Sequence, residues 1–318
     1  MNPLRRGASA RLHSAKGAAS APAPLDAQPF VPAPGDYAEF LRLMLPKQQK
    51  NVASHRLGSE RVWLKKAGPR HGKWGYRVMA AVARMARLDI IKPVPNPGGE
   101  AAIATEARRL RQLAAAGLRV PAVLAQQPDG LLISDLGQSG RATVVLQERL
   151  DQAAAAGPAA LLAVWRVGLA AIAKVHVRGQ HLSQAFDRNL VQCPDGVIGY
   201  IDFEDDPSEV MTLAECQARD WLSYLHSTAM MLEAAAPEAA GQHWHAALAE
   251  VDTEVRERIA EAARRMKWAQ KLPASRRWGR DTQRVRAGRR WGRDTQRVRA
   301  VARLLGRWHL GPAAALQN

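Results

Sequence analysis

Apolar and polar residues alternate in short runs in the first half of the chain, which is the pattern of half-buried strands. Residues Arg61–Lys65 alternate directly after a Gly58-Ser59 turn, and this predicts a strand that places Val62 and Leu64 on one face. Two more short strands are predicted at residues 122–126 and 131–134, because a Pro-Asp-Gly turn separates two apolar runs.

Later segments carry the composition and length of helices. Helices are predicted at Glu100–Ala116, which Gly117 ends, and at residues 161–175, 214–236 and 241–271, with one strand at 197–203 between them. Strands first and helices later predict a two-lobed α+β fold, with a small β-rich N-lobe and a mostly helical C-lobe.

Composition changes mark the boundaries of these units. Residues 1–35 are rich in Ala, Pro and Ser, which predicts a disordered basic arm or an over-extended start of the reading frame. No continuous apolar region follows its basic residues, so no secretory signal is expected. We expect the N-lobe at 36–137, including a helical stretch at Tyr76–Leu88, the C-lobe at 138–271 and a basic Arg/Trp tail at 272–318.

The net charge of +17 is concentrated at the two ends of the chain. Residues 264–318 carry net +14 and residues 1–35 carry net +3, so residues 36–263 are neutral. The high pI therefore describes the appendages and not the body. Two cysteines give no disulfide framework, and a reducing, cytoplasmic compartment is expected. The most apolar stretch, residues 153–175, contains Arg166 and Lys174 and is predicted to be a buried helix.

The tail contains a tandem repeat. Residues 276–288 read RRWGRDTQRVRAG, and residues 289–300 repeat the first twelve letters. Identity at this level indicates a recent duplication and not a solenoid. Because the chain has accepted this insertion, we expect the tail to tolerate change.

A spaced set of polar residues near the middle of the chain is the strongest chemical pattern. Asn189 follows Gln184 by five residues, Asp202 follows Asn189 by thirteen and opens an Asp-Phe pair, and His176 precedes Gln184 by eight. In this spacing the chain resembles the protein-kinase-like superfamily, nearest the small bacterial and RIO-type branches that include lipopolysaccharide core kinases. There a catalytic Asp, a metal-binding Asn and the metal-binding Asp of D-F-G have these separations.

The resemblance extends upstream and implies a nucleotide site. Val62-Trp63-Leu64-Lys65 is similar to the V-A-I-K strand, whose Lys binds ATP phosphates, and alternation favours Lys65 over Lys66. Glu106 is similar to the helix Glu that pairs with this Lys. Ser134 and Leu136 stand where the hinge would contact adenine.

Further roles are implied in the second half. Asn189 and Asp202 would hold Mg²⁺, and Arg188 would contact the substrate or the transferring phosphate. Asp220 would be the buried Asp that anchors the catalytic loop. The acidic run 204–206 is open to two interpretations, a solvated turn or a source of extra metal ligands.

The chain departs from the family pattern at the base. Gln184 stands at the catalytic-base position and cannot accept a proton, although it can orient a hydroxyl. Asp187 and Asp206 are candidates to replace it. No Gly-rich loop precedes Lys65. Only 17 residues separate Asp202 from Asp220, which favours a sugar, lipid or small-molecule acceptor over a peptide.

Three functions are consistent with these observations. The first is a kinase-like phosphotransferase that moves the γ-phosphate of ATP to a non-protein acceptor, which is a cell-envelope sugar, a lipid or a small molecule. The second is a pseudokinase that binds nucleotide or regulates a partner. The third is a basic protein that binds nucleic acid or a membrane surface. For residues 264–318 we favour an anionic membrane surface over nucleic acid, which predicts a cytoplasmic protein peripheral to the inner membrane.

Overall fold

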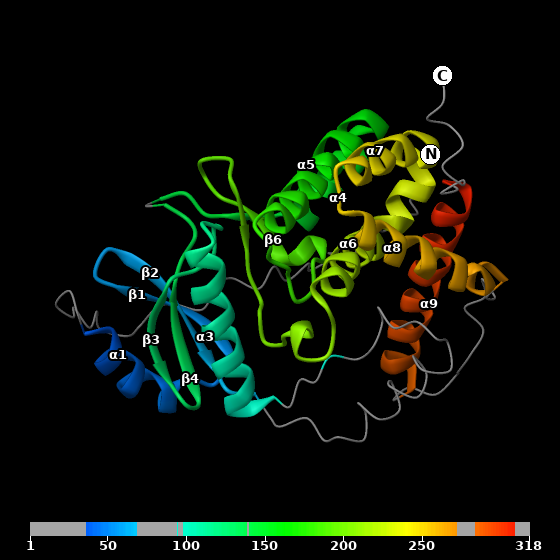
Figure 1. Cartoon of the computed structure of the whole chain (residues 1–318). Coiled ribbons are helices and arrows are strands. Elements are labelled where there is room, and N and C mark those ends of the chain that lie inside the picture. Colours follow the sequence, from blue (N-terminus) through cyan, green and yellow to red (C-terminus); the bar gives the residue numbers. More distant parts are fainter. Residues whose placement is uncertain (1–35, 69–93, 95–97, 139, 272–283, 309–318) are drawn as a thin grey trace, which may run out of the picture.

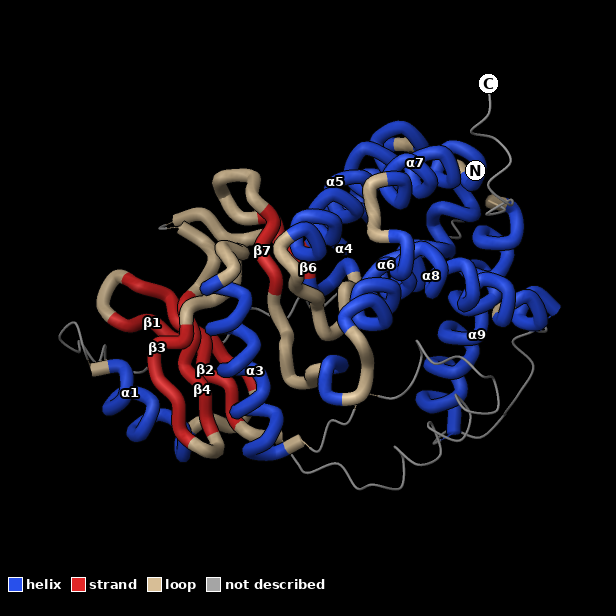
Figure 2. Tube along the Cα trace, viewed as in Figure 1, coloured by secondary structure: helices blue, strands red, loops and turns tan. Residues whose placement is uncertain are grey.

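The fold is taken from a computed structural model of the chain. It describes residues 36–68, 94, 98–138, 140–271 and 284–308, with the backbone alone at 284–294. The chain is α+β: an antiparallel four-stranded sheet near the N-terminus is followed by a mostly helical region that holds a small three-stranded sheet (Figure 1, Figure 2). The predicted arm at 1–35, the predicted helix at Tyr76–Leu88 and residues 276–283 of the repeat lie outside the described residues.

The N-terminal sheet has the strand order β1-β2-β4-β3 with every neighbouring pair antiparallel. The strands are β1 (Val52–Leu57), β2 (Glu60–Lys66), β3 (Val123–Gln127) and β4 (Gly130–Ser134). The predicted strands agree with β2, β3 and β4 apart from their end residues. Gly58 has φ +59° in the turn between β1 and β2, a conformation that glycine adopts without steric cost. Strand β1 was not predicted, since it is an edge strand with mostly exposed side chains.

One helix covers each face of this sheet (Figure 1). Helix α1 (Tyr37–Met44), followed by the short η1 (Leu45–Lys47), buries Phe40 and Leu41 in a cluster with Val62 and Leu64. Helix α3 (Gly99–Ala115) packs on the opposite face and belongs to the main core. Because side chains alternate along a strand, Lys65 points to the α3 face, as the sequence predicted.

The second half of the chain is built from helices around buried tryptophans. The elements are β5 (Val144–Val145), α4 (Leu146–Ala156), α5 (Pro158–Val177), η3 (Asp187–Asn189), β6 (Leu190–Gln192), β7 (Ile198–Tyr200), η4 (Pro207–Glu209), α6 (Leu213–Ala235), α7 (Pro237–Ala249), α8 (Thr253–Arg265), η5 (Lys267–Lys271) and α9 (Arg284–Arg307). Trp165 on α5, Trp221 on α6 and Trp244 on α7 are fully buried. This core is continuous with the residues that α3 and β4 bury.

Two predicted elements differ from the structure. The single helix expected at 241–271 is divided into α7, α8 and η5, because Asp252 caps a new helix by accepting a hydrogen bond from the Glu254 N–H. The strand expected at 197–203 ends at Tyr200, because Asp202 adopts φ +74° and turns the chain out of the sheet.

The C-terminal segment contributes to the core. Helix α9 packs along α6, and its apolar residues from Ala300 to Leu305, together with Trp308, join the main cluster. The Trp308 ring lies 5.8 Å from that of Trp244, and its Nε1 donates to the Pro237 carbonyl at 2.6 Å. The end of the predicted tail is therefore a packed element and not a solvated extension. The second repeat copy lies within α9.

Among the described residues, α5 alone is long and apolar enough to cross a membrane. The core helix of a soluble protein passes the same test of length and hydropathy, so this result is weak evidence for a span. Its buried residues include Leu161, Trp165, Leu169 and Ile172, which pack in the main core.

Candidate active site

A cavity of about 360 Å³ opens at the α3 face of the N-terminal sheet, next to the small sheet. Its size is that of a ligand pocket. Apolar residues from both regions form most of the wall: Val52, Leu110, Ile133, Leu136, Val191 and Ile201. Polar and charged residues gather at one part of it: Lys65, Glu106, Arg188, Asn189 and Asp202. Six of the eight predicted site residues are thus in these two groups, and Ser134 also lines the cavity.

The Lys65 ammonium is surrounded by three carboxylates. Its Nζ lies 2.6 Å from Glu106 Oε2, 3.3 Å from Glu204 Oε1 and 3.8 Å from Asp202 Oδ1. Lys65 and Glu106 are both buried, whereas the side chains of Asp202 and Glu204 are about half exposed. Burial alone would lower the pKa of Lys65, but the three carboxylates together raise it, so the ammonium stays charged. Burial raises the pKa of Glu106, whose charge therefore depends on Lys65.

Asp202 reaches this cluster through its backbone conformation. It is the one non-glycine residue with positive φ among those described, and Asp is one of the residues that tolerate this region. The Ile201 N–H donates to the Asn189 carbonyl at 3.0 Å, which fixes the segment before it against the loop that carries Asn189.

The loop from His181 to Asn189 is anchored from α6. Asp220, fully buried, accepts hydrogen bonds from the Leu182 N–H at 2.7 Å and from His176 Nε2 at 3.0 Å. Within the loop, Asn189 Nδ2 donates to the Gln184 carbonyl at 2.9 Å. Because its nitrogen is used in this way, the Asn189 Oδ1 atom remains the one suited to a metal ligand.

Gln184 and Arg188 have different surroundings. The Gln184 Nε2 donates to Asp205 Oδ2 at 3.0 Å, and Gln184 lines a small hollow together with Asn189 and Asp202. Arg188 lines the main cavity, and its guanidinium carbon lies 4.4 Å from the centre of the Phe186 ring.

Ser134 and Leu136 lie where β4 leaves the sheet. The Ser134 hydroxyl accepts a hydrogen bond from the Ala122 N–H at 2.8 Å, which joins the end of β4 to the segment before β3. Between them, Asp135 accepts from Trp63 Nε1 at 2.7 Å and thereby fixes an aromatic ring at the cavity wall.

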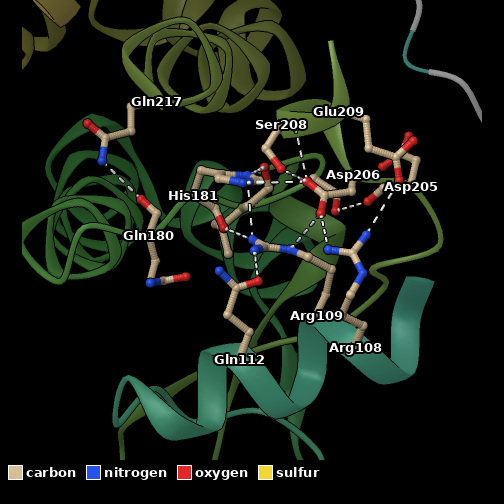
Figure 3. Close-up of polar contacts among 12 residues, drawn as sticks. Arg108, Arg109, Gln112, Gln180, His181, Asp205, Asp206, Ser208, Glu209 and Gln217 are labelled. Atoms are coloured by element: carbon tan, nitrogen blue, oxygen red, sulfur yellow. Dashed lines mark hydrogen bonds and ion pairs between the residues drawn. The ribbon is translucent and has the colours of Figure 1, made fainter. Parts of the chain in front are cut away.

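The acidic run is a tethered segment and not a solvated turn (Figure 3). The Asp206 side chain is fully buried, with Arg108 Nη1 at 2.8 Å, Arg109 Nε at 3.9 Å and His181 Nε2 at 3.6 Å. Arg109 Nη2 also donates to the His181 carbonyl at 2.6 Å. These contacts join α3 to the loop and pair the Asp206 carboxylate with positively charged side chains.

Asp187 is also directed elsewhere. Its backbone N–H donates to Ser227 Oγ on α6 at 3.2 Å, and its own carboxylate accepts from the Arg188 N–H at 2.9 Å. Asp205, which the sequence did not single out, is the acid that contacts Gln184.

One signal could have found the contact between α3 and the loop and was missed. Arg109 lies three residues after Glu106, so both side chains share the inward face of the predicted helix. An arginine on that face requires a buried acid as partner. No such local signal separates Asp205 from Asp206, since their partners are distant in sequence.

The donor chemistry of this end of the cavity fits Mg²⁺. Among the described residues, no group of three or more His, Cys, Asp and Glu side chains is placed to hold a metal ion. Magnesium in nucleotide sites is held by one or two protein oxygens together with the phosphates, and Asn189 and Asp202 can supply these oxygens.

Neither a protein-family model nor a curated protein matches the chain.

Proposed function

We propose that the chain is a kinase-like phosphotransferase that moves the γ-phosphate of ATP to a non-protein acceptor. The proposal includes a two-lobed protein-kinase-like fold, with an N-lobe at 36–137 and a helical C-lobe at 138–271. The observation that carries it is the buried Lys65–Glu106 pair at 2.6 Å, beside Asp202 and in one cavity with Asn189. Residues from distant parts of the chain meet there with the charges that a nucleoside triphosphate requires.

In this proposal the adenine occupies the apolar part of the cavity, beside the backbone of Ser134 and Leu136. Lys65 binds the phosphates, held by Glu106, and Arg188 offers a second positive charge to the transferring group. Asn189 and Asp202 would hold Mg²⁺, which supplies neutralisation of phosphate charge when bound. Catalysis of this kind is mostly positioning and charge stabilisation, so it is compatible with a glutamine at position 184.

The acceptor is proposed to be a cell-envelope sugar, a lipid headgroup or a small molecule. The segment after Asp202 is short and is held by the Asp206 contacts, with only η4 before α6 begins. It offers no extended platform on which a peptide could lie.

Calorimetry of ATP with and without Mg²⁺ tests the nucleotide site. We expect magnesium-dependent binding by the wild type that Asp202→Ala abolishes. Asp195→Asn, at an exposed ion pair with Arg119, is the matched control and should bind as the wild type does. Binding that is unchanged in Asp202→Ala, or absent from the wild type, would contradict the proposal.

A pseudokinase is the second candidate, and the amide of Gln184 at the base position favours it. This candidate predicts nucleotide binding without turnover. Phosphate transfer from ATP that is lost in Asn189→Ala would exclude it.

The basic C-terminal segment is proposed to bring the protein to an anionic membrane surface in the cytoplasm. Part of its charge is already used, since Arg303 pairs with Glu233 at 2.5 Å and Arg307 with Glu238 at 3.3 Å. Co-sedimentation with vesicles of anionic or neutral phospholipid, with and without residues 276–288, tests this. Equal sedimentation with both lipids would contradict it, and salt-sensitive retention by nucleic acid alone would favour the other partner class.

A further inference from the structure

The base position is coupled to a carboxylate that the kinase spacing does not contain. The Gln184 amide donates through Nε2 to Asp205 Oδ2 at 3.0 Å. A carboxylate accepts hydrogen bonds only, so it fixes the amide with nitrogen toward Asp205 and with the carbonyl oxygen directed away. The neighbouring Ser183 hydroxyl donates to the Asp205 backbone carbonyl at 2.5 Å, which holds the same residue from the loop side.

The other acids near the loop are occupied. The Asp206 carboxylate is enclosed by Arg108, Arg109 and His181, and the Asp187 carboxylate accepts from the Arg188 N–H and interacts with Ser227 of α6. Glu204 pairs with Lys65 at 3.3 Å. Asp205 is therefore the acid whose carboxylate contacts the side chain at the base position.

We propose that Asp205 is the proton acceptor of the reaction and that Gln184 positions both Asp205 and the acceptor hydroxyl. This inference rests on the proposed function. The hydroxyl proton passes to the Asp205 carboxylate, directly or through one water molecule. The hydroxyl oxygen forms its bond to the γ-phosphorus as the bond from phosphorus to the β,γ-bridging oxygen breaks, and the nucleoside diphosphate leaves with that electron pair. Asp205 then returns its proton to water.

The surroundings of Asp205 suit this role. The residue is 7% exposed, so its carboxylate is largely removed from water. Burial raises its pKa, while the hydrogen bond from Gln184 and the charge of Arg219 oppose this. A proton acceptor works best when its pKa is near the working pH, and a carboxylate with a raised pKa is closer to it.

The decisive variant is Asp205→Asn, which keeps the shape and the acceptor oxygen for Gln184 Nε2 but removes the proton acceptor. The probe is Mg-ATP with water as the acceptor, followed as phosphate release under single-turnover conditions. We expect the rate to fall on the order of 10²–10³-fold, which is the range for loss of a general base. Affinity for Mg-ATP should stay within about threefold. The melting temperature should fall somewhat, because Arg219 loses the attraction of the Asp205 charge.

Two further variants separate chemistry from structure. Asp195→Asn is the control that should release phosphate at the wild-type rate. The exchange Gln184→Asp with Asp205→Asn moves the carboxylate to the position used by protein kinases and gives it an amide partner. We expect this exchange to recover at least about tenfold of the rate lost in Asp205→Asn. We also expect the wild-type rate to fall at low pH with a titration that Asp205→Asn abolishes, which a merely structural role for Asp205 would not produce.

The outcomes distinguish the assignment from the proposed function. A wild type that binds no Mg-ATP overturns both. A wild type that binds Mg-ATP but releases phosphate no faster than Asp202→Ala overturns the assignment of a proton acceptor. Intact turnover in Asp205→Asn, or an exchange variant that binds Mg-ATP yet recovers nothing, overturns the role of Asp205 and leaves the nucleotide site standing.

Discussion

Removal of Glu106 is the most direct test of the buried charge cluster. Glu106→Gln keeps the shape of the side chain but leaves Lys65, 8% exposed, without its closest carboxylate. Breaking a buried ion pair by removing one partner typically costs about 3–5 kcal/mol. Lys65 keeps Asp202 and Glu204, but both are about half exposed and screened by solvent. We therefore expect a loss of unfolding free energy of about 2–3 kcal/mol.

The assay is equilibrium denaturation combined with a double-mutant cycle. A loss of this size lowers the melting temperature by roughly 3–5 °C in a chain of this length. Lys65→Met should also destabilise, since it leaves Glu106 buried without a cation. The double variant Lys65→Met with Glu106→Gln should lose less stability than the sum of the two single variants, because it leaves neither a buried cation nor a buried carboxylate without its partner. Mg-ATP binding should be absent in all three.

Additive losses of stability in the double variant would refute this reasoning. They would mean that each side chain acts through its own packing and not through the charge of the other. Glu106→Gln with unchanged stability would likewise show that Asp202 and Glu204 satisfy Lys65 without it. Asp195→Asn, at an exposed pair, is the control and should melt at the wild-type temperature.

Further variants test other contacts of the structure. Asp206→Asn should lower the free energy of unfolding at neutral pH by about 3 kcal/mol, since it leaves two arginines without their buried anion. Burial would raise the pKa of Asp206, but the hydrogen bonds from Ser208 and Arg108 and the charge of Arg109 lower it. The ionised Asp206 should therefore stabilise the fold fully above its ordinary pKa of 3.8, and this stabilisation should be lost as the pH falls through the lower pKa of the folded state. An acid-unfolding transition of the same size in the wild type and in Asp206→Asn would contradict this. Asp220→Asn should lower the free energy of unfolding by about 2 kcal/mol and slow phosphate release. If this variant were as stable as the wild type, the loop would not need Asp220 as an anchor. Deletion of 276–288 should leave folding and Mg-ATP binding intact, and a large loss of stability in the deletion variant would contradict this. Trp308→Ala should lower the free energy of unfolding by about 3–5 kcal/mol in the same denaturation assay.

Local periodicity was sufficient to predict much of the N-terminal sheet. The choice of Lys65 over Lys66 follows from alternation alone, because Val62 and Leu64 must face the core under α1. The ion pair with Glu106 needed more than periodicity. It was expected only from the resemblance to the protein-kinase-like superfamily that the spacing of Asn189 and Asp202 suggested, and the structure brings these residues to one cavity.

The roles of neighbouring acids could not be predicted in this way. Asp205 and Asp206 are identical in type and adjacent, yet one contacts the loop residue Gln184 and the other contacts Arg108, 98 residues away in sequence. Only the packing of α3 against the loop decides which of the two carboxylates contacts Arg108 and which contacts Gln184. The division of the helix expected at 241–271 was missed for a simpler reason, since the Asp252 cap was not weighed against the helical composition around it.

The extended conformation around Asp206 explains how one short segment serves two purposes. Asp206 has φ −131° and ψ 102°, and consecutive side chains in extended backbone point to opposite sides. Asp205 therefore faces Gln184 while Asp206 faces α3, the helix that also holds Glu106. A displacement of α3 would have two costs at once. It would break the Lys65–Glu106 pair, and it would leave the buried Asp206 carboxylate without Arg108 and Arg109. The two losses oppose the same movement, so we expect α3 to hold Glu106 against Lys65 before any nucleotide is bound.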